Sequence, residues 1–140
     1  ATRDLLVKVL PYHPFLVKPN NHELGDIFGV KLSTREEVVP YGRKLQEMGA
    51  QNVLISMAGE GAVLIAADGQ SMGAPAPKGT LVNGVGAGDS MVAGFLTGWM
   101  EKKDYVHAFH MGIAAGSASA FSGNLATREE VLQVLQQVEQ

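Results

Sequence analysis

Residues 82–94 read VNGVGAGDSMVAG, a glycine-rich segment that leads into an apolar one. Glycines at positions 84, 86 and 88 remove Cβ atoms from the backbone and tolerate positive φ angles. The apolar residues that follow recur at three- and four-residue spacing, as in an amphipathic helix: Met91, Val92, Phe95, Leu96 and Trp99. A glycine loop that opens a helix presents free backbone N–H groups to an anion. The stretch therefore predicts an anion-binding loop followed by a helix.

A carboxylate, Asp89, directly follows the last glycine of this loop. From the residue alone, a helix N-cap is the simpler interpretation, because aspartate is among the best capping residues. A cap does not require three alternating glycines, however. Beside an anion-binding loop, the carboxylate can instead act as a general base that takes a proton from a hydroxyl, while the loop N–H groups hold the phosphoryl group under attack. The loop lacks the Gly-Lys-Ser/Thr ending of a P-loop and the G-x-G-x-x-G spacing of a dinucleotide-binding loop.

The composition is that of a globular domain, with 46% hydrophobic and 18% charged residues in a chain of 140. A net charge of −3 and a pI near 5.8 argue against a nucleic-acid-binding protein. The absence of cysteine excludes disulfides and thiolate metal sites. No apolar run approaches the ~20 residues of a membrane span. We therefore expect a cytoplasmic protein with neither nucleic acid nor membrane as a partner.

Local signals divide the chain into strands and helices. Short apolar runs bounded by proline or glycine predict buried strands at 14–18, 52–56 and 62–67. Asp68 and Gly69 predict a hairpin that leads into an extended segment at 70–82. Capping residues and apolar spacing predict helices near 3–10, 20–28, 34–48, 89–100, 104–121 and 128–138. This order predicts an α/β fold with a mainly parallel sheet flanked by helices.

The sequence Gly86, Ala87, Gly88 and Asp89, inside residues 82–94, resembles the C-terminal signature of the PfkB (ribokinase-like) carbohydrate kinases. The residues that continue it resemble most the branch of 1-phosphofructokinase and tagatose-6-phosphate kinase. The resemblance implies an ATP-dependent kinase of ribokinase-like fold in which Asp89 is the catalytic base. It also implies that the amides of Gly86, Ala87 and Gly88 form the anion hole, and that Gly88 and Asp89 contact the nucleotide.

A second stretch, with Lys18, Asn20 and Glu23, resembles the K-P-N-x-x-E-L segment of the same family. The resemblance implies that these residues bind Mg²⁺ and phosphate through water. Taken alone, Asn20 is more simply a helix cap with Glu23 as its partner. A lone carboxylate with an amide nevertheless suits Mg²⁺, because this ion keeps most of its waters.

A third stretch resembles the family's Ser-x-Gly-x-x-Gly turn, which lies along the phosphates and ribose of ATP. Without that context, an ordinary glycine turn between two strands explains it equally well. The nucleotide-binding residues that the resemblance implies here are Ser56, Met57, Ala58, Glu60, Gly59 and Gly61.

The resemblance covers essentially all 140 residues but only the C-terminal half of such a kinase. We therefore expect residues 1–140 to be the nucleotide-binding, catalytic portion, without the N-terminal sugar-binding half and lid, and inactive alone. The implied reaction of the full-length protein is ATP-dependent conversion of fructose 1-phosphate to fructose 1,6-bisphosphate. Tagatose 6-phosphate is the alternative acceptor, and nucleotide binding without turnover is the alternative for the fragment. A homodimer of the full-length protein and, because Asn83 and Gly84 depart from the family pattern, monovalent-cation dependence are left open.

Overall fold

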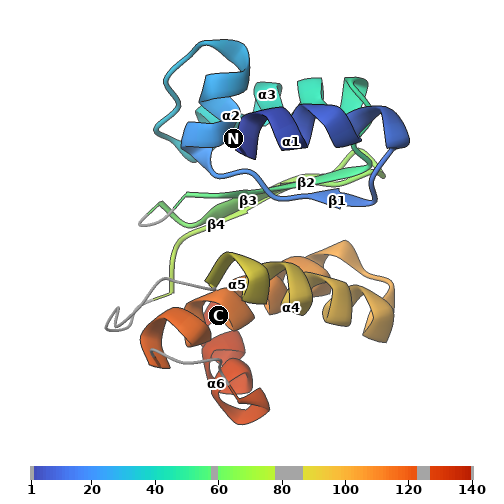
Figure 1. Ribbon diagram of the computed structural model, residues 1–140. Coiled ribbons are helices and arrows are strands. Elements are labelled where there is room, and N and C mark those ends of the chain that lie inside the picture. Colours follow the sequence, from blue (N-terminus) through green and yellow to red (C-terminus); the bar gives the residue numbers. More distant parts are fainter. Residues whose placement is uncertain (1, 58–59, 78–86, 123–126, 140) are drawn as a thin grey trace. The chain divides into compact units, whose positions relative to one another are not determined.

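The computed structural model describes residues 2–57, 60–77, 87–122 and 127–139 (Figure 1). The chain divides into two compact units, Ala1–Pro75 and Ala76–Gln140. The first unit contains a sheet and helices, and the described part of the second contains helices.

The first unit packs three helices on one face of a four-stranded sheet (Figure 1). Its core lies between α3 and the sheet, where Val38 and Leu45 of the helix join Val53 and Ile55 of the neighbouring strand among the fully buried side chains. The elements follow one another as α1 (Thr2–Val9), a 3₁₀ turn (Leu10–Tyr12), β1 (Leu16–Val17), α2 (Asn21–Phe28), α3 (Arg35–Glu47), β2 (Asn52–Ser56), β3 (Ala62–Ile65) and β4 (Ser71–Ala74).

The strand order is β1-β2-β3-β4, and the sheet is mixed. The β1–β2 pair is parallel, whereas the β2–β3 and β3–β4 pairs are antiparallel. The α/β class is confirmed, but the prediction of a mainly parallel sheet is wrong for the described strands. The reason is the length of the connections, because a parallel pair needs a crossover of about a dozen residues. Residues 18–51, with two helices, form such a crossover between β1 and β2. Residues 57–61 and 66–70, which join the later strands, are too few for a crossover.

The local signals are largely confirmed in this unit. The Asp68–Gly69 turn joins β3 to β4, with Gly69 at a φ of 95° and the Gln70 N–H donating to the Asp68 carboxylate. The strand predicted at 14–18 is shorter, since only Leu16 and Val17 pair as a ladder. The extended segment predicted at 70–82 contains β4, and its last residues, from 78 onward, lie outside the described residues.

Helix α3 begins with a capping box. Thr34 Oγ1 accepts from the Glu37 N–H at 3.2 Å, and Glu37 Oε1 accepts from the N–H groups of Ser33 and Thr34 at 3.0 and 2.9 Å. The pKa of Glu37 is held below its ordinary value of 4.5 by these hydrogen bonds. The Ser33 N–H has the largest effect, followed by the Thr34 N–H and the Thr34 hydroxyl.

The lowered pKa of Glu37 predicts a pH-dependent contribution to stability. Its ionised carboxylate stabilises the fold above pH 4.5, and this contribution is lost as the pH falls from there through the lowered pKa of the folded state. We expect Glu37→Gln to flatten the acid limb of a denaturation curve measured from pH 5 to pH 2 (about the range of carboxyl titration). Glu36→Gln, one residue earlier in the same turn, is the control, and an equal flattening there would contradict the assignment.

The second unit contains α4 (Ala87–Lys102), α5 (Tyr105–Ser122) and α6 (Arg128–Glu139). Helices α4 and α5 run antiparallel in close contact, because a Cβ atom built at Gly94 would lie 2.6 Å from both the Ala115 Cβ and the Met111 carbonyl oxygen. Gly98 faces α5 in the same way, since a Cβ atom built there would lie 2.9 Å from the Ala108 Cα. The small residues of both helices therefore set how closely the helices approach.

The predicted apolar face of α4 is only partly correct. Phe95 is fully buried, but Leu96 is 38% exposed and Trp99 is half-buried, with its ring stacked on Tyr105 at 4.3 Å between centroids. Two adjacent positions of a helix point about 100° apart, so Phe95 and Leu96 cannot share the narrow contact with α5. Of the helices in the described residues, none has both the length and the apolar character to cross a membrane.

Candidate active site

Asp89 lies in the first turn of α4, two residues after the helix begins at Ala87. It is therefore not the N-cap that the residue type alone suggests. Its carboxylate is exposed. The N–H groups of Ala87 and Gly88 occupy the first two helical positions, and the first four N–H groups of a helix have no partner within it. An acceptor of protons and donors for an anion thus share one helix end. Gly86, the remaining predicted member of the anion hole, lies outside the described residues.

A cavity of about 540 Å³ opens beside this helix end, entirely within the second unit. Helix α4 lines it with Asp89, Ser90 and Thr97, α5 with Ser119, and α6 with Arg128. Its volume is in the range of small-molecule sites. Most of the remaining lining is apolar, and the polar groups are a carboxylate, hydroxyls and a guanidinium. The guanidinium and the hydroxyls can bind an anionic group, and the carboxylate can accept a proton.

In the first unit, the predicted metal- and phosphate-binding residues form a rigid helix start. Asn20 Oδ1 accepts from the Glu23 N–H at 2.8 Å, and Glu23 Oε1 accepts from the Asn20 N–H at 2.9 Å. The cap interpretation of these two residues is therefore confirmed. Glu23 keeps its second carboxylate oxygen for another partner, and Lys18 is partly buried just before the cap.

The same helix start lies next to the predicted nucleotide turn. Asn20 forms a parallel bridge with Ser56, and the Ser56 N–H donates to the Pro19 carbonyl at 3.1 Å. The two stretches follow β1 and β2, whose carboxyl ends meet at one sheet edge because these strands are parallel. Residues 36 positions apart in sequence are thus brought together.

The turn after β2 is closed by its own backbone. The Met57 N–H donates to the Gly61 carbonyl, and the Glu60 N–H donates to the Met57 carbonyl, each at 2.9 Å. Gly61 has a φ of 95°, and Met57 is buried in the core, so the Met57 side chain packs rather than faces a ligand. Glu60 is exposed, Ser56 is partly buried, and Ala58 and Gly59 lie outside the described residues.

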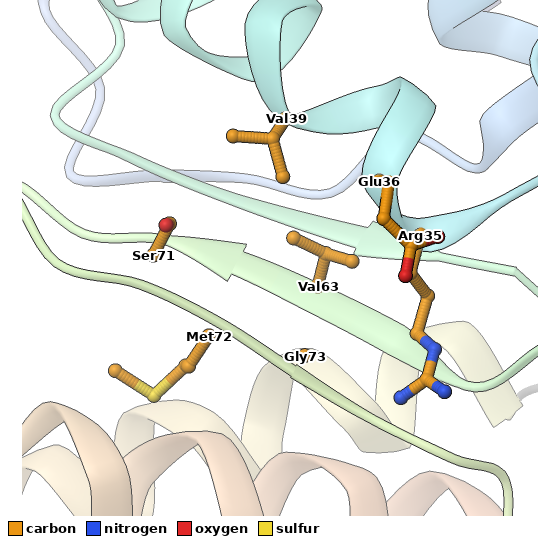
Figure 2. Close-up of a pocket in the computed structure, with 7 residues that line it drawn as sticks. All are labelled: Arg35, Glu36, Val39, Val63, Ser71, Met72 and Gly73. Atoms are coloured by element: carbon orange, nitrogen blue, oxygen red, sulfur yellow. The ribbon is translucent and has the colours of Figure 1, made fainter.

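A further cavity of about 300 Å³ lies on the first unit, over β3 and β4 (Figure 2). It is lined by Arg35 and Glu36 from the start of α3 and by Val63, Met72 and Gly73 from the strands. Figure 2 shows the Arg35 side chain reaching past Gly73, where a Cβ would lie 3.5 Å from the Arg35 Cδ. A charged side chain across the outermost described strand protects it from pairing with another chain. The cavity contains none of the predicted site residues.

The sequence profile of the pfkB family of carbohydrate kinases matches residues 2–131. The chain belongs to the PfkB family. The match covers both units, so the helix start at Asn20, the turn at 56–61 and the helix end at Asp89 all lie within the family region.

Individual relatives of this PfkB chain agree with that assignment. It is 50% identical over 135 residues to the 1-phosphofructokinase of Bacillus subtilis (strain 168), covering 96% of the chain and 44% of the relative. It is 35% identical over 142 residues to the D-tagatose-1-phosphate kinase of Klebsiella oxytoca, covering 99% and 46%. A crystal structure of a candidate phosphofructokinase from Staphylococcus aureus superposes with a TM-score of 0.90 at 40% identity, over 96% of this chain and 44% of that one. The chain therefore spans less than half the length of these relatives.

Two residues of the PfkB chain's cavity were missed in the sequence, Ser119 and Arg128. Both lie about 30 or more positions beyond Asp89 and reach the cavity only because α5 and α6 pack beside α4. The small residues of α5 allow a close helix contact, and this is the only feature of the sequence that relates to the cavity. A serine among alanines and glycines and an arginine after a helix cap have no distinctive pattern of their own.

Proposed function

We propose that the protein carrying this chain transfers the γ-phosphoryl group of ATP to a hydroxyl of a sugar phosphate, with fructose 1-phosphate as the acceptor and fructose 1,6-bisphosphate as the product. The observation that carries the proposal is the exposed carboxylate of Asp89 in the first turn of α4, beside a cavity of small-molecule size. The name of the 50% identical relative, 1-phosphofructokinase, supports the choice of acceptor.

Asp89 is the proposed general base. The acceptor oxygen attacks the γ-phosphorus, the bond from that phosphorus to the β–γ bridging oxygen breaks with its electron pair going to ADP, and Asp89 takes the hydroxyl proton. The N–H groups of Gly86, Ala87 and Gly88 stabilise the charge on the transferred group. The turn at 56–61 holds the nucleotide, with Ser56 and the exposed Glu60 as its polar side chains, and Gly61 lets the turn pack against the end of β4.

Glu23 is the proposed holder of Mg²⁺, which spreads the charge of the ATP phosphates when it is bound. The described residues contain no group of three or more histidine and carboxylate side chains that could enclose an ion. The capping box holds Glu23 Oε1, which fixes the carboxylate and leaves its other oxygen for the ion. One protein oxygen suits Mg²⁺, because this ion keeps most of its waters. Asn20 fixes that carboxylate, and Lys18 supplies positive charge for a phosphate.

A comparison of acceptors tests the proposal. Fructose 1-phosphate, tagatose 1-phosphate and tagatose 6-phosphate should be assayed side by side with Mg-ATP, following ADP release and the bisphosphate product. We expect the largest kcat/KM for fructose 1-phosphate. Tagatose 1-phosphate is the second candidate, because a 35% identical relative is named for it. A larger kcat/KM for either tagatose phosphate would overturn the assigned acceptor. ADP release without phosphorylation of any acceptor would overturn the proposed kinase activity.

For the 140 residues alone, we propose nucleotide binding without turnover. Its relatives are more than twice as long, and Asp89, which takes the proton of the acceptor hydroxyl, is its one residue with a proposed role toward the sugar. Calorimetry with Mg-ATP and a coupled assay on the same preparation should give binding heat but no product. Turnover by these residues alone would contradict the proposal. The cytoplasmic location and the homodimer stay predictions.

A further inference from the structure

Two buried serines join α4 to α5. Ser119 Oγ donates to Ser90 Oγ at 2.8 Å, and the two residues are only 6% and 8% exposed. Among the described side chains of the second unit, they are the buried polar ones. Because a buried hydroxyl is expensive to leave unpaired, this contact holds the two helices in one arrangement.

The hydrogen bond sits at the end of α4 that carries Asp89. Ser90 is the next residue in the same helical turn, and both serines line the cavity beside Asp89. Any movement of the first turn of α4 relative to α5 would therefore stretch this bond and displace the carboxylate together.

Away from this end, close packing holds the two helices together. Gly94 lies against Ala115, Gly98 lies against Met111, and the buried Phe95 packs on Gly112. The Ser90–Ser119 bond adds a directional constraint at the end of α4 that carries Asp89.

We propose that Ser119, acting through Ser90, is a positioning residue that holds the first turn of α4 so that the Asp89 carboxylate faces the acceptor hydroxyl. The inference rests on the proposed function of Asp89. Small displacements of a reacting group lower the rate strongly even where binding is unaffected. The loss should therefore fall on kcat rather than on KM.

The test is a double-mutant cycle in the protein carrying this chain, with Ser119→Ala, Ser90→Ala and both together. We expect each single variant to lower kcat about ten-fold, with KM for ATP and for the acceptor changed less than about two-fold. The double variant should be no slower than the slower of the single ones, because each single variant already removes the Ser90–Ser119 bond. Ile113→Val is the matched control, since it removes a buried methylene group from the same helix and weakens packing without touching a hydroxyl.

The outcomes separate the two proposals. If Ile113→Val and Ser119→Ala lower the stability equally and also lower kcat equally, the positioning role is wrong. It is also wrong if the effects of the two serine variants on kcat simply add. If KM rises while kcat is unchanged, the serines serve binding and the role is again wrong. If Asp89→Asn abolishes turnover while Ser119→Ala does not change it, only the positioning role fails. If Asp89→Asn leaves turnover unchanged, the proposed function itself fails.

Discussion

Asp89→Asn is expected to lower kcat by about 10²- to 10⁴-fold, the usual contribution of a general base. Asparagine keeps the size of the side chain in the first turn of α4 but cannot take a proton from the acceptor hydroxyl. Binding of Mg-ATP should survive, because asparagine keeps the size of the side chain and the proposed nucleotide turn at 56–61 is unchanged. Steady-state kinetics in the protein carrying this chain, with calorimetry for ATP, measures both quantities.

Glu47→Gln is the matched control for this experiment. Glu47 is an exposed carboxylate at the last residue of α3, and its replacement removes a negative charge in the same way. It precedes β2, whereas the proposed nucleotide turn follows that strand. We expect its kcat to match that of the unmodified protein. Unchanged turnover in Asp89→Asn would remove Asp89 from the mechanism, whereas equal losses in both variants would point to net charge as the cause.

The elements of the fold could be predicted well where the signal is local. The capping boxes that begin at Asn20, Thr34 and Thr127 depend on residues three positions apart, and all three are present. The hairpin at Asp68 depends on two adjacent residues. In each case a short segment contains the donor, the acceptor and the required backbone geometry, so distant residues are not needed to form it.

The direction of the strands was predicted less well, although the necessary information was in the sequence. The expectation of a mainly parallel sheet came from the alternation of strands and helices. That alternation holds between β1 and β2 but ends at Ser56, after which only short connections follow. The length of each connection is a better guide than the overall class, since a few residues cannot carry a strand back to start at the same end.

The candidate site was predicted where its residues are contiguous and missed where packing assembles it. Asp89 and the helix it opens were found from a short stretch. Ser119 and Arg128 reach the same cavity from two other helices, and no local pattern marks them. Met57 lies inside a motif that predicts nucleotide binding, but its side chain belongs to the core, so the prediction can hold only for its backbone.

Gly61→Ala is expected to destabilise the fold by about 3–5 kcal/mol, the sum of backbone strain and overpacking. Gly61 has a φ of 95°, and a Cβ added there would lie 1.9 Å from the Ala74 carbonyl oxygen and 2.7 Å from the Pro75 carbonyl carbon. These are backbone atoms at the end of β4, so relief requires the turn after β2 to move away from that strand. The free energy of unfolding, from urea denaturation followed by circular dichroism, measures the loss.

Gly69→Ala separates the two causes, because Gly69 also has a φ of 95° but nothing lies within 4 Å of its added Cβ. The Gly69→Ala variant has the backbone strain without the steric clash, and its free energy of unfolding should fall by about 1–3 kcal/mol. The excess at Gly61 then measures how tightly the turn is held against β4. That excess also bears on the nucleotide, since a turn pushed off β4 should bind Mg-ATP more weakly, whereas Gly69→Ala should leave the ATP affinity unchanged. Equal destabilisation by the two variants would mean that the turn moves freely, and that Gly61 is required for its φ angle alone.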